Sequence, residues 1–145
     1  MNLIETPLTD ESFIRNLIPQ KSPFVMVDKL NYFSSNKIVS GFKIKEENLF
    51  SDSKVFQAPG LIENMAQTIA MHTGYKYFLE NRPAPVGYIG AIKKVEIFGL
   101  PKVGQELVTT VNILHDIMGV TMVSAKVECK DSLIARSEMK TTLAK

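Results

Sequence analysis

The chain has 145 residues, of which 45% are hydrophobic and 22% charged, and its formal net charge at pH 7 is +2. These values are typical of one globular domain over residues 1–145, and so small a charge without Lys/Arg runs argues against binding to nucleic acid. The single cysteine, the absence of an apolar N-terminal segment and the lack of any apolar run near the ~20 residues of a membrane span together predict a cytoplasmic protein without a membrane span.

The N-terminal third is expected to contain a short helix and two strands. Residues 9–18 ("TDESFIRNLI") carry apolar side chains at helical spacing, with Thr9 as the N-cap and Pro19 ending the helix. Strands are predicted over residues 23–34 and 38–47, which the polar turn "SSNK" separates. In the second strand the side chains alternate, so that one face is apolar. A loop, "NLFSDSKVFQA", follows.

One long helix is predicted over residues 59–81. Pro59 suits the first turn of a helix, because the N–H that proline lacks needs no partner there. A wide apolar stripe follows at helical spacing, made by Leu61, Ile62, Met65, Ala66, Ile69 and Ala70. The helix-breaking stretch "ENRPAP" ends it.

The remainder of the chain is predicted to form strands, over residues 86–97, 105–117, 120–129 and 132–144. Apolar and polar side chains alternate along them, which is typical of an antiparallel sheet with one face in water. One apolar helix and about six strands pack most economically when the sheet curls around the helix. The sequence therefore predicts an α+β fold of that kind.

One residue of the long helix does not fit its surroundings. Glu63 lies three residues after the Pro59-Gly60 pair, among Leu, Ile, Met and Ala side chains. A buried carboxylate costs several kcal/mol unless a partner compensates it. Glu63 is therefore either a solvated or salt-bridged helix residue, or a residue kept for chemistry.

Three stretches of the chain carry a resemblance to a known family. They are "LIPQKSPFVMVDKL", "PGLIENMAQ" and "IGAIKKVEIFGLPKVGQEL", and they occur in this order over most of the sequence. Together they resemble the bacterial 3-hydroxyacyl-[acyl-carrier-protein] dehydratases of the FabA/FabZ type. This resemblance implies the hot-dog fold, in which an antiparallel sheet wraps around one long central helix.

The resemblance also implies a site. Glu63 falls on the catalytic acidic residue of the family, and Gln67 falls on the glutamine one helical turn later. The two are spaced at i and i+4, so their side chains share a face of the helix and can hydrogen bond. The resemblance further implies a homodimer, or a higher oligomer of dimers, with each active site at the subunit interface and the acyl chain in a tunnel between the subunits.

The sequence departs from the family in the loop before the long helix, which is about four residues shorter, and at the start of that helix, where "APGLIE" is a compressed form of the family's pattern. The family pairs its acidic residue with a histidine in the loop before the long helix, whereas "NLFSDSKVFQAPG" contains none. The two histidines of the chain, His72 and His115, are interpreted as a structural helix residue and a satisfied strand residue. Asp52 in the shortened loop is interpreted as a turn residue, and Cys129 as a small core side chain.

Dehydration of a 3-hydroxyacyl thioester needs a base, an acid for the departing hydroxyl and a donor for the thioester oxygen. Glu63 is the candidate acid, or an acid/base that serves both steps. The free N–H groups of Gly60 and Leu61, at the start of the helix, are the candidate substrate-binding donors. We expect neither a metal nor a cofactor.

The function predicted is that of a dehydratase acting on 3-hydroxyacyl thioesters, bound to acyl carrier protein, in fatty-acid or polyene-type lipid synthesis. Two alternatives stay open. The first is a hot-dog acyl thioesterase, in which Glu63 would activate water. The second is a catalytically weak acyl-binding partner of an active dehydratase. The missing histidine favours the last alternative and a hetero-oligomer with a related hot-dog protein, whereas the retained Glu63 argues against it.

Overall fold

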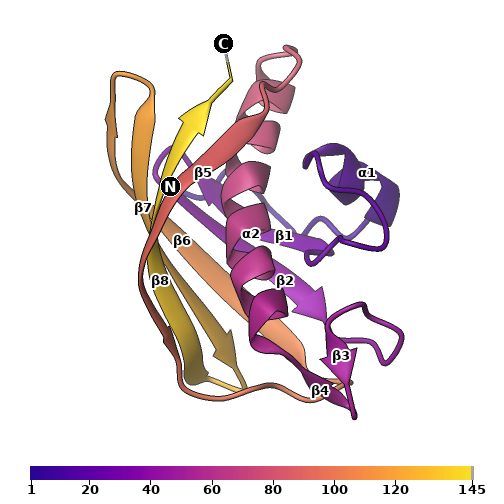
Figure 1. Cartoon of the computed structure of the whole chain (residues 1–145). Helices are drawn as coiled ribbons and strands as arrows, with labels where there is room; N and C mark the ends of the chain where they lie inside the picture. Colours follow the sequence, from indigo (N-terminus) through magenta and orange to yellow (C-terminus); the bar gives the residue numbers. More distant parts are fainter. Residues whose placement is uncertain (145) are drawn as a thin grey trace.

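The computed structural model of the chain describes residues 1–144. A six-stranded antiparallel sheet, with strand order β1-β2-β6-β7-β8-β5, curves around one long helix, α2 (Figure 1). The strands are β1 (Lys29–Ser34), β2 (Lys37–Lys43), β5 (Gly87–Ile97), β6 (Glu106–Ile117), β7 (Val120–Cys129) and β8 (Ser132–Leu143), and α2 is Ala58–Leu79. The predicted sheet wrapped around a helix is therefore confirmed.

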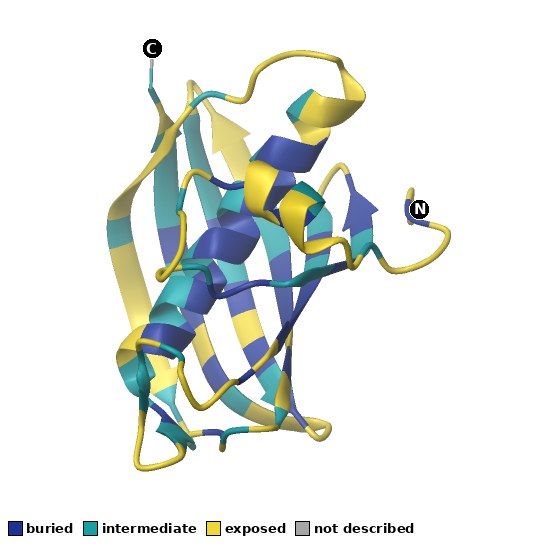
Figure 2. Cartoon of the chain, turned by 90° about the vertical axis from the view of Figure 1, so that its right-hand side faces the viewer, coloured by how far each residue is buried: buried dark blue, intermediate teal, exposed yellow. Residues whose placement is uncertain are grey.

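Helix α2 is buried both on the side that faces the sheet and on the side away from it. Leu61, Met65 and Met71 are fully buried and belong to the same core cluster as Ile14 and Met26, which precede the first strand. The segment before β1 therefore covers the helix on the side away from the sheet. Figure 2 shows the result, with α2 buried over its middle turns and the short N-terminal helix largely exposed. Burial of apolar surface on both sides stabilises the position of α2.

The N-terminal helix, α1 (Glu11–Asn16), starts one residue later than predicted. Its N-cap is Asp10, whose Oδ1 accepts a hydrogen bond of 3.1 Å from the N–H of Phe13. Thr9 is therefore not the cap. Asp and Thr are both good N-caps, and neighbouring candidates cannot be separated by propensity alone.

Strand β1 is shorter than the predicted strand, because residues 23–27 leave the sheet and cross α2 instead. Their backbone groups bond to side chains of the helix. The N–H of Met26 donates to Gln67 Oε1 at 2.6 Å, and the carbonyl of Met26 accepts from Asn64 Nδ2 at 2.7 Å. A buried backbone must find partners somewhere, and here the helix supplies them.

The loop before α2 contains a small hairpin that the sequence did not predict, made of β3 (Ser51–Asp52) and β4 (Val55–Phe56). Its two turn residues, Ser53 and Lys54, have φ values of 51° and 65°. Glycine or asparagine is usual in such a turn, so the sequence carried no clear signal for it. The hairpin buries Phe56 completely, directly below the first turn of α2.

The two edges of the sheet are β1 and β5. Strand β5 hydrogen bonds to β8 on one side only, and most of its residues are exposed. Within residues 1–144, no helix is long and apolar enough to cross a membrane.

Candidate active site

The candidate site centres on Glu63 and Gln67, which face the segment that crosses α2. Gln67 is fully buried and Glu63 is half-buried. Gln67 Nε2 donates to Glu63 Oε1 at 2.9 Å and to the carbonyl of Phe24 at 2.7 Å, while Gln67 Oε1 accepts from the N–H of Met26. Both donor hydrogens of the amide are thus in use. Gln67 therefore orients one carboxylate oxygen of Glu63 and leaves the other oxygen available.

A second buried amide holds the same helix against the sheet. Asn64 Oδ1 accepts from Thr109 Oγ1 of β6 at 2.6 Å, and its backbone carbonyl accepts from Thr68 Oγ1 at 2.8 Å. Thr68 Oγ1 also lies 2.7 Å from Ser40 Oγ of β2. This chain of bonds runs from the sheet through the helix to residues 24–26. It fixes the rotation of α2 about its axis, and with it the direction in which Glu63 points.

Asn64 and Thr68 were not predicted as part of the site, although the sequence contains a signal for them. Three uncharged polar residues, Asn64, Gln67 and Thr68, occur at helical spacing within an otherwise apolar stretch. Polar groups on a buried helix face require partners, so such a pattern predicts a hydrogen-bonded network inside the core.

The N–H groups at the start of α2 are not as free as predicted. The N–H of Gly60 donates to the carbonyl of Gln57 at 2.9 Å, and the N–H of Leu61 contacts the same oxygen at 3.4 Å. The first bond has ordinary geometry, so the expectation of a free donor at Gly60 is wrong for this structure. The second is longer than a good hydrogen bond, so the Leu61 N–H is the more available donor.

Gly60 is required at its position for a different reason. A Cβ atom there would overlap the ring of Phe56, which lies directly against the first turn of the helix. The glycine therefore allows close packing of the β3–β4 hairpin under α2.

Neither histidine is placed to act with Glu63. His72 follows it by nine residues on α2, which corresponds to about 13 Å along the axis. His72 is buried, its ring stacks on Phe33 and its Nε2 lies 2.9 Å from the carbonyl of Ser34. Burial lowers the pKa of His72, and the charge of Lys76 lowers it further. His115 is exposed near the end of β6, on the sheet.

The loop does not supply a substitute base. Asp52 is exposed and accepts a hydrogen bond from its neighbour Ser53 at 3.3 Å, as expected of a turn residue. Cys129 is buried and free. Among residues 1–144, no cluster of three or more His, Cys, Asp or Glu side chains could hold a metal ion.

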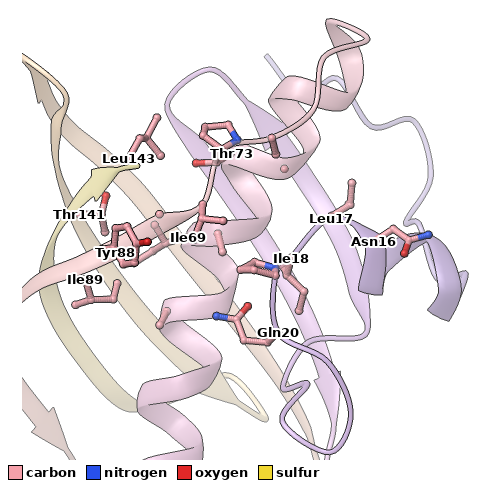
Figure 3. Close-up of a pocket in the computed structure, with 18 residues that line it drawn as sticks. Asn16, Leu17, Ile18, Gln20, Ile69, Thr73, Tyr88, Ile89, Thr141 and Leu143 are labelled. Atoms are coloured by element: carbon pink, nitrogen blue, oxygen red, sulfur yellow. The ribbon is translucent and has the colours of Figure 1, made fainter. Parts of the chain in front are cut away.

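A cavity of about 350 Å³ lies alongside α2, between the segment that follows α1 and the start of β5 (Figure 3). Its wall on α2 begins at Ala66, three residues after Glu63, and continues to Gly74. Glu63 does not itself line the cavity. The carboxylate thus lies about one helical turn from the beginning of a largely apolar space.

The antiparallel sheet curved around one long central helix defines a hot-dog protein. The solved structure of the dehydratase heterocomplex ApeI:P from Xenorhabdus doucetiae contains a chain with this fold. Its TM-score to the present structure is 0.84 at 15% sequence identity, and 91% of each chain is covered.

Comparison of the sequence with protein families shows to which family the chain belongs. Residues 12–144 match the family model described as ApeP-like, ApeP dehydratase, and the chain belongs to this family. Two relatives named 3-hydroxyacyl-[acyl-carrier-protein] dehydratase FabZ are similar over most of their length. The one from Sulfurovum sp. (strain NBC37-1) is 25% identical over 136 residues, covering 88% of this chain and 91% of its own. The one from Wolinella succinogenes is 26% identical over 151 residues, covering 94% and 97%.

Proposed function

We propose that this chain is the acid-bearing subunit of a dehydratase that removes water from 3-hydroxyacyl thioesters. The observation that carries the proposal is the Glu63 carboxylate, which is half-buried, oriented through one oxygen by Gln67 and placed one turn from an apolar cavity. The names of the relatives and of the family support a dehydratase as the class of enzyme.

In the proposed reaction a base removes the proton at C2 of the acyl group. The electrons of that C–H bond form the C2–C3 double bond, and the C3–O bond breaks. Protonated Glu63 gives its proton to the departing hydroxyl, so that water leaves. Gln67 is a positioning residue in this scheme, because both of its N–H donors are bonded to Glu63 and Phe24 and its oxygen accepts from Met26. The Leu61 N–H, with its long 3.4 Å contact to Gln57, polarises the thioester oxygen.

The base at C2 is proposed to come from a second subunit, a related hot-dog protein that carries the loop histidine. Three observations support this. The loop 48–60 contains no histidine, His72 and His115 both lie away from Glu63, and the structural relative named above is described as a dehydratase heterocomplex, ApeI:P. In a homodimer of this chain, both sites would lack the histidine.

The substrate is proposed to arrive on an acyl carrier protein. The support is the name shared by the FabZ relatives, which act on acyl groups attached to such a carrier. An acyl chain attached to a carrier enters from one end only, so a cavity that extends away from Glu63 along α2 suits the free end of the chain.

The test measures enoyl thioester formation from a 3-hydroxyacyl carrier protein, with this chain alone and after co-expression with a histidine-bearing hot-dog protein. We expect turnover in the mixed assembly. Glu63→Gln keeps the shape of the side chain and removes its proton transfer, so the rate should fall about 10²- to 10⁴-fold. Glu46→Gln, the same change at an exposed turn residue, is the matched control and should leave the rate unchanged.

The same samples separate the alternatives. Release of free thiol without enoyl product would identify a thioesterase. Full activity of Glu63→Gln would rule out the role proposed for this residue, and an inactive mixed assembly that still binds acyl carrier protein would make the chain an acyl-binding partner only.

A further inference from the structure

The two edges of the sheet differ in whether their outer backbone groups have partners. Strand β5 bonds to β8 on one side, and its other side meets no strand within residues 1–144. Strand β1 bonds to β2 on one side, while residues 2–8, which precede α1, lie along its other side. In Figure 2 the N-terminus lies on the side of the molecule opposite the C-terminus, which follows β8. An edge with free N–H and C=O groups can pair with another sheet, whereas a covered edge cannot.

The segment before α1 bonds to β1 at two positions. The N–H of Leu30 donates to the carbonyl of Leu8 at 2.9 Å, and the N–H of Leu8 donates to the carbonyl of Leu30 at the same distance. The carbonyl of Phe33 accepts from the N–H of Leu3 at 2.7 Å, and the N–H of Phe33 donates to Oδ1 of Asn2 at 3.0 Å. Four backbone groups on the outer side of β1 are therefore already bonded within the chain.

The same segment is anchored in the core and offers little to a further strand. Ile4 is 6% exposed and belongs to the core cluster, and its N–H donates to Oδ1 of Asn2 at 3.0 Å. Glu5 and Pro7 are exposed, and proline has no N–H with which to bond to a neighbouring strand. Exposed charge and proline are features with which natural sheets keep an edge from pairing. The segment therefore covers β1 without creating a new pairing edge.

We propose that residues 2–8 are an edge cap, which leaves β5 as the edge through which this chain pairs with a second sheet. Without the cap, two copies joined through β5 would still present β1 at each end of the shared sheet. Such pairs would then add to one another through the β1 strands of two copies, and every addition would leave a new free edge. The cap thus ends sheet-to-sheet assembly at a pair, and it does so independently of the reaction proposed above.

The experiment removes the two bonds at Phe33 and measures the mass of the assembly by light scattering over a range of concentrations. Asn2→Ala combined with Leu3→Pro takes away the acceptor of the Phe33 N–H and the donor to its carbonyl, and both changed side chains are exposed. We expect the mean mass to rise with concentration to about twice that of the wild type or more, because each further pairing joins two existing assemblies. Thr6→Ala, a change at an exposed residue of the same segment, is the matched control and should keep the wild-type mass.

A lysine on the uncovered edge shows whether the growth occurs through β1. Asn31→Lys, added to the double variant, places a charge on this strand and should return the mass to the wild-type value. Growth that persists in the presence of this lysine overturns the proposal. A folded double variant that keeps the wild-type mass at every concentration overturns it as well.

Amide hydrogen exchange tests the cap directly if the double variant does not fold. The single change Asn2→Ala leaves Ile4 in place and removes the acceptor of the Phe33 N–H. We expect this N–H to exchange about tenfold faster than in the wild type, the effect of one lost hydrogen bond. The N–H of Leu30, which bonds to Leu8, should exchange as before. Equal exchange of the Phe33 N–H in the two proteins would show that the segment does not close the edge.

Discussion

At the scale of single residues, the site depends on buried amides that are hydrogen bonded through both nitrogen and oxygen. Gln67 connects the carboxylate of Glu63 to the backbone of residues 24–26 through three hydrogen bonds. We therefore propose that Gln67 orients Glu63 and does not transfer a proton, although both residues were predicted as catalytic. The assignment of each stays a prediction until activity is measured.

Replacement of Gln67 by Met should affect stability and activity together. The side chain keeps its length but loses both donors and the acceptor, so the buried N–H of Met26 and carbonyl of Phe24 lose their partner. We expect the free energy of unfolding in urea to fall by about 1–3 kcal/mol. The pH–rate profile of the remaining activity should also shift, because Glu63 loses its donor. The control, Gln105→Met, removes one exposed hydrogen bond from the N–H of Lys102 and leaves no buried group without a partner, so it should cost less than the change at Gln67.

His72 should make the free energy of unfolding depend on pH. Burial lowers its pKa from the ordinary 6.5, so the unfolded chain binds the proton at a pH where the folded chain does not. Stability therefore rises with pH up to about 6.5 and is lost as pH falls below this value. His72→Gln should flatten this part of the curve of unfolding free energy against pH. An unchanged curve in the variant would contradict the role of His72.

At the scale of elements, the contact that shapes the site is the crossing of α2 by the segment between α1 and β1. Two side chains of the helix, Asn64 and Gln67, bond to the backbone of that segment, and Gly74 meets Leu17 at its far end. This arrangement positions Glu63 at one end of the crossing and forms the cavity wall at the other.

Gly74→Ala tests how tightly the two elements are joined. The added methyl group would overlap the backbone carbonyl of Leu17, which cannot move aside as a side chain could. We expect the variant to lose about 1–3 kcal/mol of stability in urea unfolding. Gly99→Ala is the matched control, since a Cβ there meets nothing within 4 Å. That variant should be as stable as the wild type, or slightly more stable because the unfolded chain loses freedom.

At the scale of the whole molecule, the edge strand β5 exposes apolar side chains. Several large apolar residues of β5 and the turn after it are exposed, among them Tyr88, Ile92, Val95 and Phe98. An exposed apolar edge invites pairing with another sheet. Assembly through β5, with a second copy or with a related chain, is therefore our prediction.

Ile92→Lys should weaken such an assembly. A charge in the centre of the edge strand opposes pairing of β5 with a second sheet. We expect a lower mass by light scattering at micromolar concentration, for the chain alone or mixed with its histidine-bearing partner. Val108→Lys on β6, inside the sheet but equally exposed, is the control and should keep the wild-type mass. Equal masses for wild type and Ile92→Lys would place the interface elsewhere.

The sequence by itself determined the elements whose signals are local. Alternation of side chains predicted the six strands of the sheet, and Pro59 with the breaker "ENRPAP" predicted the ends of α2 to within two residues. Glu63 could also be singled out from the sequence, because a charged residue among apolar neighbours is recognisable within a short stretch of chain. These features follow from periods of two and 3.6 residues, which the chain carries without any knowledge of its tertiary contacts.

Only the tertiary structure decided the features that join distant parts of the chain. Residues 23–27 have the pattern of a strand, yet they leave the sheet, and Gln67 and Asn64, about 40 positions later, bond to the backbone of Phe24 and Met26. The close approach of Gly74 to Leu17, the bonded N–H of Gly60 and the unpaired oxygen of Gln20 are likewise consequences of packing. Hydrogen-bond saturation of a buried group depends on which segments meet around it, and that is a property of the folded molecule rather than of any short stretch of sequence.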